Sequence, residues 1–318
     1  MTAEVISTTQ GARDGRRPGP QRSGRRSALK KISRVVRMIP LVPAIIIMVV
    51  FLAGPIIWSF YGSLTNAALS GANAANSSFI GLDNYVKLFN DPVFPQSLWI
   101  TIVFTLASAV ISQNVLGLGI ALVVTRANKR LATIVSSTVV GAWILPEIVA
   151  AFVCYAYFSQ DGTLNQILAL VGLTGPNWLY TFPLLAVVLA NLWRGTAFSL
   201  LVYQAALNDV PPEISEAAMI DGAGGAKRLF FVTIPMIKNT ITTNLMLITL
   251  QTLSVFTLIY VMTSGGPGND STTLPILAYK EAFRFGNIGY GTAIATILLL
   301  IGAVFSIIYI RAARPSKD

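Results

Sequence analysis

One apolar segment of the sequence, residues 182–207, carries polar side chains along a single face of the helix that it predicts. The residues that share this face, at intervals of 3, 1 and 3, are Asn191, Arg194, Gly195 and Phe198. Amide and guanidinium groups are costly in an apolar surrounding unless they face protein or a water-filled path. This face is therefore expected either to line a path for a polar solute or to hold neighbouring helices together.

A second apolar segment, residues 241–262, repeats this arrangement. Three of its polar side chains fall on one helix face and the last lies beside them: Asn244, Gln251, Ser254 and Thr252. Amides and hydroxyls can exchange hydrogen bonds with a solute, and they also join helices inside membranes. The sequence leaves both roles open for each of these residues.

Glu147 is the only acidic residue well inside an apolar segment. It can neutralise Arg194, gate a path or relay protons, and pairing with Arg194 is the simplest of these roles. Arg194 can equally pair across a subunit interface. The chain has no His and a single Cys, which excludes imidazole chemistry, His-ligated metals and an internal disulfide. Apolar neighbours predict that Cys154 is simply buried.

These segments belong to a chain whose composition suits a membrane. Of its 318 residues 54% are apolar and only 11% are charged, against about 25% charged in soluble proteins. A helix of about 20 apolar residues crosses the hydrocarbon core of a bilayer. The stretches that reach this length are residues 38–60, 98–124, 134–158, 182–207, 241–262 and 290–310. We expect an all-α membrane protein with six transmembrane helices.

The basic residues predict how the spans are oriented. Residues 1–37 carry ten of the 23 Lys and Arg among polar residues, which predicts a disordered cytoplasmic arm that contacts anionic membrane lipid and no nucleic acid. The outer loops hold only Lys87, Lys280 and Arg284. Because basic loops stay in the cytoplasm, both termini are expected there, with residues 313–318 as a short cytoplasmic tail.

The loop between the fourth and fifth stretches, within residues 209–235, predicts a short cytoplasmic helix. Asp209 can cap it, and Glu216 favours the positive end of the helix dipole. Gly222 is expected to end it, since glycine accepts the left-handed conformation of a helix C-terminus. The glycines around Gly222 do not form a phosphate-binding loop, because Ala226 precedes Lys227 where that motif requires glycine.

This loop resembles the EAA signature of binding-protein-dependent ABC importer permeases. The matching residues are Glu216-Ala217-Ala218, Gly222, Val232 and Ile234-Pro235, with Val232 for the usual Ile and Ile234 for the usual Leu. The likeness extends over about residues 38–312, through Gly81-Leu82-Asp83-Asn84-Tyr85, Asn191-Leu192-Trp193-Arg194-Gly195 and Gly265-Gly266-Pro267-Gly268. It is similar to the carbohydrate-uptake branch, which serves maltose, glycerol phosphate or trehalose, and to the first of its two permease subunits.

The resemblance implies the type I permease fold of ABC importers, over residues 38–312, in a bacterial plasma membrane. It implies a permease subunit that forms half of the translocation path for a sugar or sugar derivative. The implied partners are a second permease, two ATPase subunits and an extracytoplasmic substrate-binding protein. No cofactor is expected on this chain, since ATP and Mg are bound by the partner ATPase. The turn from Gly265 to Asn269 can meet the binding protein or be an ordinary loop.

The resemblance also assigns roles to residues. The coupling contact to the ATPase is implied at Glu216, Ala217 and Ala218, the turn at Asp221 and Gly222, and the return to the membrane at Ile234 and Pro235. Sugar contacts are implied in the fourth and fifth spans. Together with the polar faces described above, these give the expected path residues Asn191, Arg194, Gly195, Phe198, Gln251, Thr252 and Ser254.

The main alternative is a secondary transporter driven by ions or protons. Such a protein requires coupling sites and usually has an inverted repeat with broken helices. Six spans, one acid within them and no visible repeat argue against it. A membrane enzyme is less consistent still, because without His only carboxylate or Lys chemistry remains and Glu147 alone is inadequate for it.

Overall fold

The computed structural model describes residues 39–312, so the predicted basic arm and the C-terminal tail lie outside the described residues. The described chain is helical, with one isolated β-bridge between Thr65 and Phe79. It divides between Ile56 and Ile57 into two units. The described part of the first unit contains α2 (Val42–Met48), a π-helical turn (Val49–Ala53) and the beginning of α3 (Gly54–Ser63). Its apolar side chains are exposed, as expected for a helix that faces lipid.

Four of the predicted spans are confirmed as continuous helical segments. They run over Val42–Ser63, Val93–Val124, Pro183–Asn208 and Ile288–Ala312, each long and apolar enough to cross a membrane. The second of these consists of α6 (Val93–Phe104), a π-helical stretch (Thr105–Gln113) and α7 (Asn114–Val124). The third is α12 and the fourth is α19.

The third and fifth predicted spans are each formed by a pair of helices with a bend between them. α8 (Lys129–Ile144) is followed by the segment Glu147–Leu170, which begins with α9 (Glu147–Phe158), and the two are bent by 105°. Pro146 explains this break, because a residue before proline avoids the helical conformation, and Leu145 has ψ of 133°. The part of the chain that the structure describes thus holds up to six spans, if each bent pair is counted as one.

The break in the fifth span separates α16 (Lys238–Leu253) from α17 (Thr257–Thr263) with a bend of 47°. No glycine or proline stands there. Ser254 Oγ donates instead to the backbone carbonyl of Gln251, at 2.9 Å, and Ser254 itself has φ of −97° and ψ of 2°. A serine that bonds its own turn in this way competes with the helical ladder.

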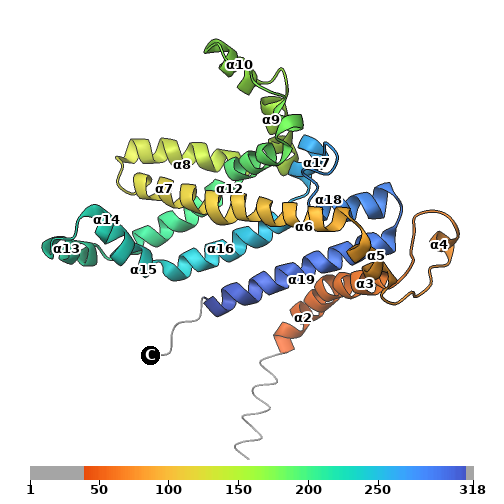
Figure 1. Cartoon of the computed structure of the whole chain (residues 1–318). Helices are drawn as coiled ribbons and strands as arrows, with labels where there is room; N and C mark the ends of the chain where they lie inside the picture. Colours follow the sequence, from red (N-terminus) through yellow and green to blue (C-terminus); the bar gives the residue numbers. More distant parts are fainter. Residues whose placement is uncertain (1–38, 313–318) are drawn as a thin grey trace, which may run out of the picture. The chain divides into compact units, whose positions relative to one another are not determined.

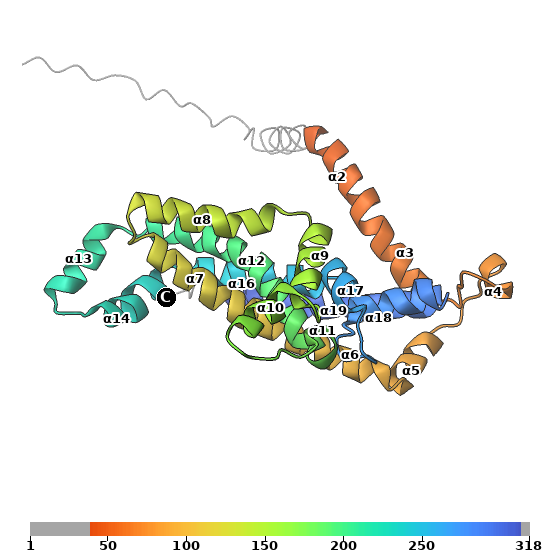
Figure 2. The ribbon, with the colours of Figure 1, turned by 90° about the horizontal axis from the view of Figure 1, so that it is seen from above.

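Shorter helices lie at the ends of the long ones in the second unit. Their bounds are α4 (Ala72–Ala75), α5 (Asp83–Asn90), α10 (Thr163–Leu170), α11 (Trp178–Thr181), α13 (Pro212–Ile220), α14 (Gly225–Arg228), α15 (Ile234–Met236) and α18 (Leu274–Tyr279). In Figure 1 and Figure 2, α7, α12 and α16 run side by side, with α13 and α14 at one end and α17 and α18 at the other. The predicted coupling loop is thus separated from the opposite loops by the length of α12, about 39 Å at 1.5 Å per residue.

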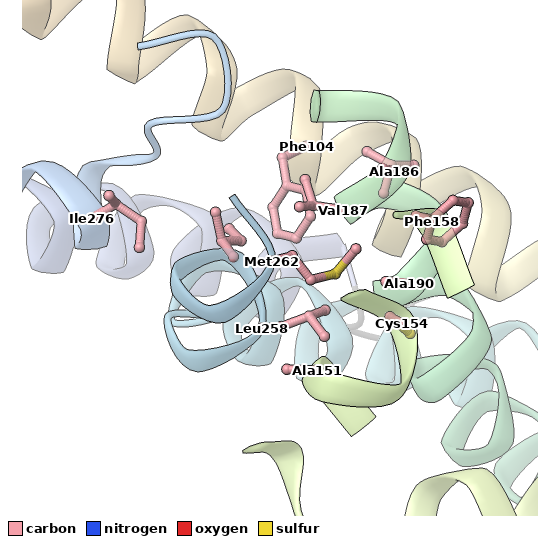
Figure 3. Packing of buried hydrophobic residues seen from close by; sticks show 12 residues of the cluster. Phe104, Ala151, Cys154, Phe158, Ala186, Val187, Ala190, Leu258, Met262 and Ile276 are labelled. Carbon is pink, nitrogen blue, oxygen red and sulfur yellow. The ribbon is translucent and has the colours of Figure 1, made fainter. Parts of the chain in front are cut away.

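The largest buried apolar cluster joins α6, α9, α12, α17 and α18 (Figure 3). Cys154 lies in it at 6% exposure, beside Ala151 of the same helix and Leu258 and Met262 of α17. The prediction that this cysteine is a buried apolar residue is confirmed. Because small residues of α9 meet larger ones of α17, the two helices lie together as one packed pair.

A buried polar cluster joins α7, α12 and α16. Asn244 is fully buried, and its Nδ2 donates to Asn114 Oδ1 at 3.0 Å, Ser199 Oγ at 3.0 Å and Tyr203 Oη at 3.1 Å. Tyr203 Oη also donates to Asn114 Oδ1. Amide groups join helices in this way inside a membrane. Asn244 therefore holds helices together, which is one of the two roles that the sequence left open for it.

Candidate functional site

The two helix breaks meet each other. Glu147, the first residue of α9, accepts a hydrogen bond through Oε1 from the backbone N–H of Leu258 at 3.3 Å. Leu258 is the second residue of α17, whose first N–H groups have no partner within their own helix. The carboxylate thus caps α17 from the neighbouring helix, and both breaks lie at the same level of the bundle.

A cavity of about 230 Å³ opens where the breaks meet α12. Every predicted path residue except Phe198 lines it, which gives Asn191, Arg194, Gly195, Gln251, Thr252 and Ser254. The remaining walls come from Gln113, Trp143, Glu147 and Val255. The structure therefore brings together two polar helix faces that are about 60 residues apart in the sequence. We refer to this cavity as the path cavity.

Asn191 lies at 5% exposure, and its polar groups are largely engaged. Its Nδ2 donates to Ser108 Oγ at 2.8 Å, and its backbone carbonyl accepts from Gln113 Nε2 at 2.9 Å. Gly195 makes room for Gln113: a Cβ at this position would lie 2.3–2.5 Å from the Gln113 carboxamide atoms. The absent side chain of Gly195 therefore accommodates a glutamine of the neighbouring helix rather than a solute.

Arg194 and Glu147 both line the path cavity, but no ion pair joins them within residues 39–312. The Glu147 carboxylate is used by Leu258, and Arg194 Nε is buried without a hydrogen-bond partner in the described structure. The predicted pairing was therefore wrong for this conformation. A buried guanidinium N–H without a partner is costly.

Gln251 differs from Asn191, because its side chain is exposed and makes no hydrogen bond to any described residue. The aromatic wall is Trp143 rather than the predicted Phe198. Phe198 lies behind it, with a distance of 6.2 Å between the two ring centroids. Sequence reasoning also missed Gln113, although a polar residue in an apolar segment was the same signal that identified Gln251.

The predicted coupling loop contains α13, α14 and a π-helical turn (Leu229–Thr233). The prediction that Asp209 caps α13 was wrong, because Asp209 is the C-cap of α12 and Pro211 stands before α13 without a side-chain cap. Gly222 ends α13 as expected, with φ of +79°. Its N–H donates to the carbonyl of Met219 at 3.0 Å, and that of Ala223 donates to Ala218 at 2.9 Å. These two bonds form a Schellman turn.

The surface of α13 is open. Glu216, Ala217, Asp221 and Gly222 are exposed, whereas Ala218 is half-buried. Arg228 Nη1 of α14 donates to Ser215 Oγ at 3.5 Å, which joins the two short helices. Ile234 and Pro235 begin α15, which leads into α16.

Large apolar side chains accompany this surface and were missed in the sequence. Ile220 at the end of α13 is 87% exposed, and Phe231 in the π-helical turn is 79% exposed. Their neighbours Met219 and Phe230 are exposed as well. A group of exposed apolar side chains marks a contact surface.

The opposite turn, from Gly265 to Asn269, is tightly bonded. Thr272 Oγ1 donates to the carbonyl of Gly265 at 2.7 Å, and Lys280 Nζ donates to Thr272 Oγ1 at 3.1 Å. Burial, with a smaller effect of the nearby Arg284 charge, lowers the pKa of Lys280. The turn is therefore an ordered element of this end of the bundle.

Comparison with known proteins identifies the fold and the family. The family described as "binding-protein-dependent transport system inner membrane component" matches residues 113–314. The sulfoquinovosyl glycerol transport system permease protein SmoG of Agrobacterium fabrum is 30% identical over 297 residues, which cover 90% of this chain and 92% of SmoG. The trehalose/maltose transport system permease protein MalF of Thermococcus litoralis is also 30% identical over 297 residues, which cover 92% of this chain and 98% of MalF.

A solved structure agrees on the fold. A bacterial alginate ABC transporter, in complex with an alginate pentasaccharide-bound periplasmic protein, superposes with a TM-score of 0.76 at 21% identity. The superposition covers 90% of this chain and 96% of that one. The expected fold of an ABC importer permease is thereby confirmed. The chain belongs to the family of binding-protein-dependent transport system inner membrane components, as a permease subunit of an ABC importer.

Proposed function

We propose that this chain is the first permease subunit of an importer for a sugar or sugar derivative, and that the path cavity is its half of the translocation path. The observation that carries the proposal is the cavity itself. The free amide of Gln251, the guanidinium side chain of Arg194 and the Trp143 ring line it from separate helices. Amides and guanidinium groups bind sugar hydroxyls, and an aromatic face covers the C–H side of a pyranose.

The cavity of about 230 Å³ is smaller than the 300–1,000 Å³ typical of sites for small organic ligands. A second, related permease is proposed to supply the facing wall. The named relatives MalF and SmoG, which belong to sugar transport systems, favour a sugar as the solute. An external substrate-binding protein is proposed to deliver it, as the periplasmic protein of the alginate complex suggests.

Coupling is proposed to occur through α13. Glu216, Ala217 and Ala218 would contact one of two ATPase subunits that hold ATP and Mg, with Ile220 and Phe231 as apolar anchors. Asp221 and Gly222 would set the turn, and Ile234 and Pro235 would pass its movement to α16. This assignment requires both termini to lie in the cytoplasm, with the protein in the plasma membrane of the cell.

The function is tested in proteoliposomes that hold the complete transporter, with labelled trehalose and maltose as probes. The substrate-binding protein is placed on the side of the membrane opposite the ATPase subunits. We expect accumulation that needs ATP, the ATPase subunits and the binding protein together. Accumulation driven by a proton gradient without ATP would contradict the proposal and favour a secondary transporter. Accumulation of neither sugar would contradict a role in neutral disaccharide import.

Gln251→Ala should lower sugar uptake about tenfold while assembly and basal ATP hydrolysis remain normal. The Gln251 side chain contacts no other described residue through hydrogen bonds, so its removal costs the solute contact alone, about 1.4 kcal/mol for a tenfold effect. Thr243→Ala is the matched control, because Thr243 is exposed on the same helix and bonds only its own turn at Asn239. Equal uptake by both variants would exclude Gln251 from the path.

A further inference from the structure

A second polar cavity, of about 610 Å³, lies away from the path cavity. It opens between the end of α9, α11 and the end of α17, and its polar and aromatic walls include Tyr155, Gln160, Asp161, Asn177, Tyr180 and Ser264. We refer to it as the outer cavity. Glu147 of the path cavity and Ser159 of the outer cavity are twelve residues apart along α9, which is about 18 Å at the rise of a helix. The packed α9–α17 pair therefore has one polar cavity at each end.

The side chains of the outer cavity are free to bind. Tyr155 and Tyr180 are 47% and 67% exposed. Neither phenol, nor the side chains of Gln160, Asp161 and Asn177, makes a hydrogen bond to another residue within 39–312. A free amide and a carboxylate beside two aromatic faces is the combination that binds a pyranose, whose hydroxyls lie at its rim and whose C–H groups form its faces.

The walls that carry these side chains are held in place by other residues. Asn165 Nδ2 donates to the carbonyls of Gln160 at 2.8 Å and Pro176 at 3.0 Å. Its Oδ1 accepts from Trp178 Nε1 at 2.7 Å. One asparagine thus joins the segments that carry Gln160 and Asn177. A site that is already ordered loses less entropy when it binds.

The opposite wall is equally fixed. Ser264 has φ of +51°, a left-handed conformation that serine adopts only when its surroundings impose it. Ser271 Oγ donates to the carbonyl of Gly266 at 3.0 Å and lies 2.8 Å from Thr263 Oγ1. Ser271 is fully buried, so these bonds tie the turn to α17. The cavity therefore lies between two ordered walls.

We propose that the outer cavity is a first binding site for a neutral sugar, occupied before the sugar reaches the path cavity. This inference rests on the proposed function, because the coupling helix lies at the far end of α12 and so places the outer cavity on the side where the sugar arrives. Asp161 is the only charged side chain of its lining. A carboxylate accepts hydrogen bonds from sugar hydroxyls and repels an acidic sugar, so the site favours uncharged sugars.

The test uses the complete transporter in proteoliposomes. The probe is labelled trehalose or labelled maltose, whichever the wild type accumulates. Tyr180→Leu and Asn177→Ala should each raise the half-saturation concentration for uptake at least tenfold, with maximal uptake and basal ATP hydrolysis unchanged. Asn177→Ala removes an exposed side chain without hydrogen bonds in the described structure, so it tests the site even where loss of the Tyr180 ring disturbs folding. Tyr157→Leu is the control, because Tyr157 lies on α9 but lines a different, apolar cavity.

A direct binding measurement separates the two sites. Saturation-transfer NMR of the transporter with trehalose should retain the sugar signal in Gln251→Ala and lose most of it in Tyr180→Leu. If Tyr180→Leu and Asn177→Ala both leave the half-saturation concentration for uptake unchanged, the outer site is overturned and the proposed function stays intact. The outer site is overturned as well if these variants weaken docking of the binding protein but leave the half-saturation concentration for the sugar unchanged, since the cavity would then be a protein contact. Failure of the wild type to accumulate either sugar would instead contradict its proposed role in neutral disaccharide import.

Discussion

Gly222→Val should lower ATP-driven uptake at least 100-fold, while the chain still inserts into the membrane and the binding protein still holds its sugar. The φ of +79° at Gly222 costs an L-residue about 1–2 kcal/mol, and more for a β-branched one. The turn would then rearrange and lose the two hydrogen bonds that end α13, so Glu216 and Ala217 would point elsewhere. Uptake in vesicles, beside a pull-down of the ATPase subunit, measures the effect.

Gly224→Val is the matched control for this substitution. A Cβ at either glycine meets no atom within 4 Å, so space is equal at the two positions. Gly224 has φ of −64°, which valine accepts, and we expect normal uptake there. Gly222→Asn should retain partial activity, because asparagine tolerates the left-handed conformation. Normal uptake by Gly222→Val would exclude α13 as the coupling helix.

Gly195→Ala should lower uptake at least tenfold by moving Gln113. The new methyl group would lie 2.3–2.5 Å from the Gln113 carboxamide, which is 2% exposed and has little room to withdraw. The displaced side chain would lose its bond to the Asn191 carbonyl and enter the path cavity. With the probe sugar, the half-saturation concentration should rise and the maximal rate of uptake should fall.

The double variant Gln113→Ala/Gly195→Ala separates this clash from a contact to the sugar. Removing the Gln113 carboxamide makes space for the methyl group, so uptake should recover above that of Gly195→Ala alone. Gly119→Ala on α7 is the control, because a Cβ there meets nothing within 4 Å. A double variant no better than Gly195→Ala would indicate that Gly195 itself faces the sugar.

The positions of the spans follow from local composition, but their breaks do not. A run of 20 apolar residues looks the same whether it is straight or bent. Pro146 marks one break in the sequence, whereas the break after Leu253 is marked only by Ser254, and serine also occurs within unbroken membrane helices. The Glu147 bond to Leu258, which caps the helix after this break, comes from α9 and so only the folded chain supplies it.

For the path residues, too, the sequence predicts the position along a helix but not the neighbour that covers it. Helical spacing places Gln251 and Asn244 on one face of an ideal helix, yet Gln251 lines the path cavity and Asn244 is buried in the polar cluster. Which neighbour covers a given turn of a helix depends on tertiary packing. For the same reason Phe198 was expected in the cavity, and Trp143 of another helix fills that place. The coupling and path roles themselves stay predictions.

The buried polar cluster has a consequence for how the protein is made. Asn114 lies 130 residues before Asn244, whose amide it binds in the finished bundle. At about 5–20 residues per second of synthesis, the side-chain oxygen of Asn114 waits roughly 6 to 26 s for that partner. The Asn114 Nδ2 meanwhile donates to the carbonyls of Ala109 and Val110 in its own span, so only Oδ1 lacks a local partner. Lipid offers no donor to this oxygen. We therefore expect α7 to stay close to the later spans until α12 brings the Tyr203 hydroxyl and α16 brings Asn244.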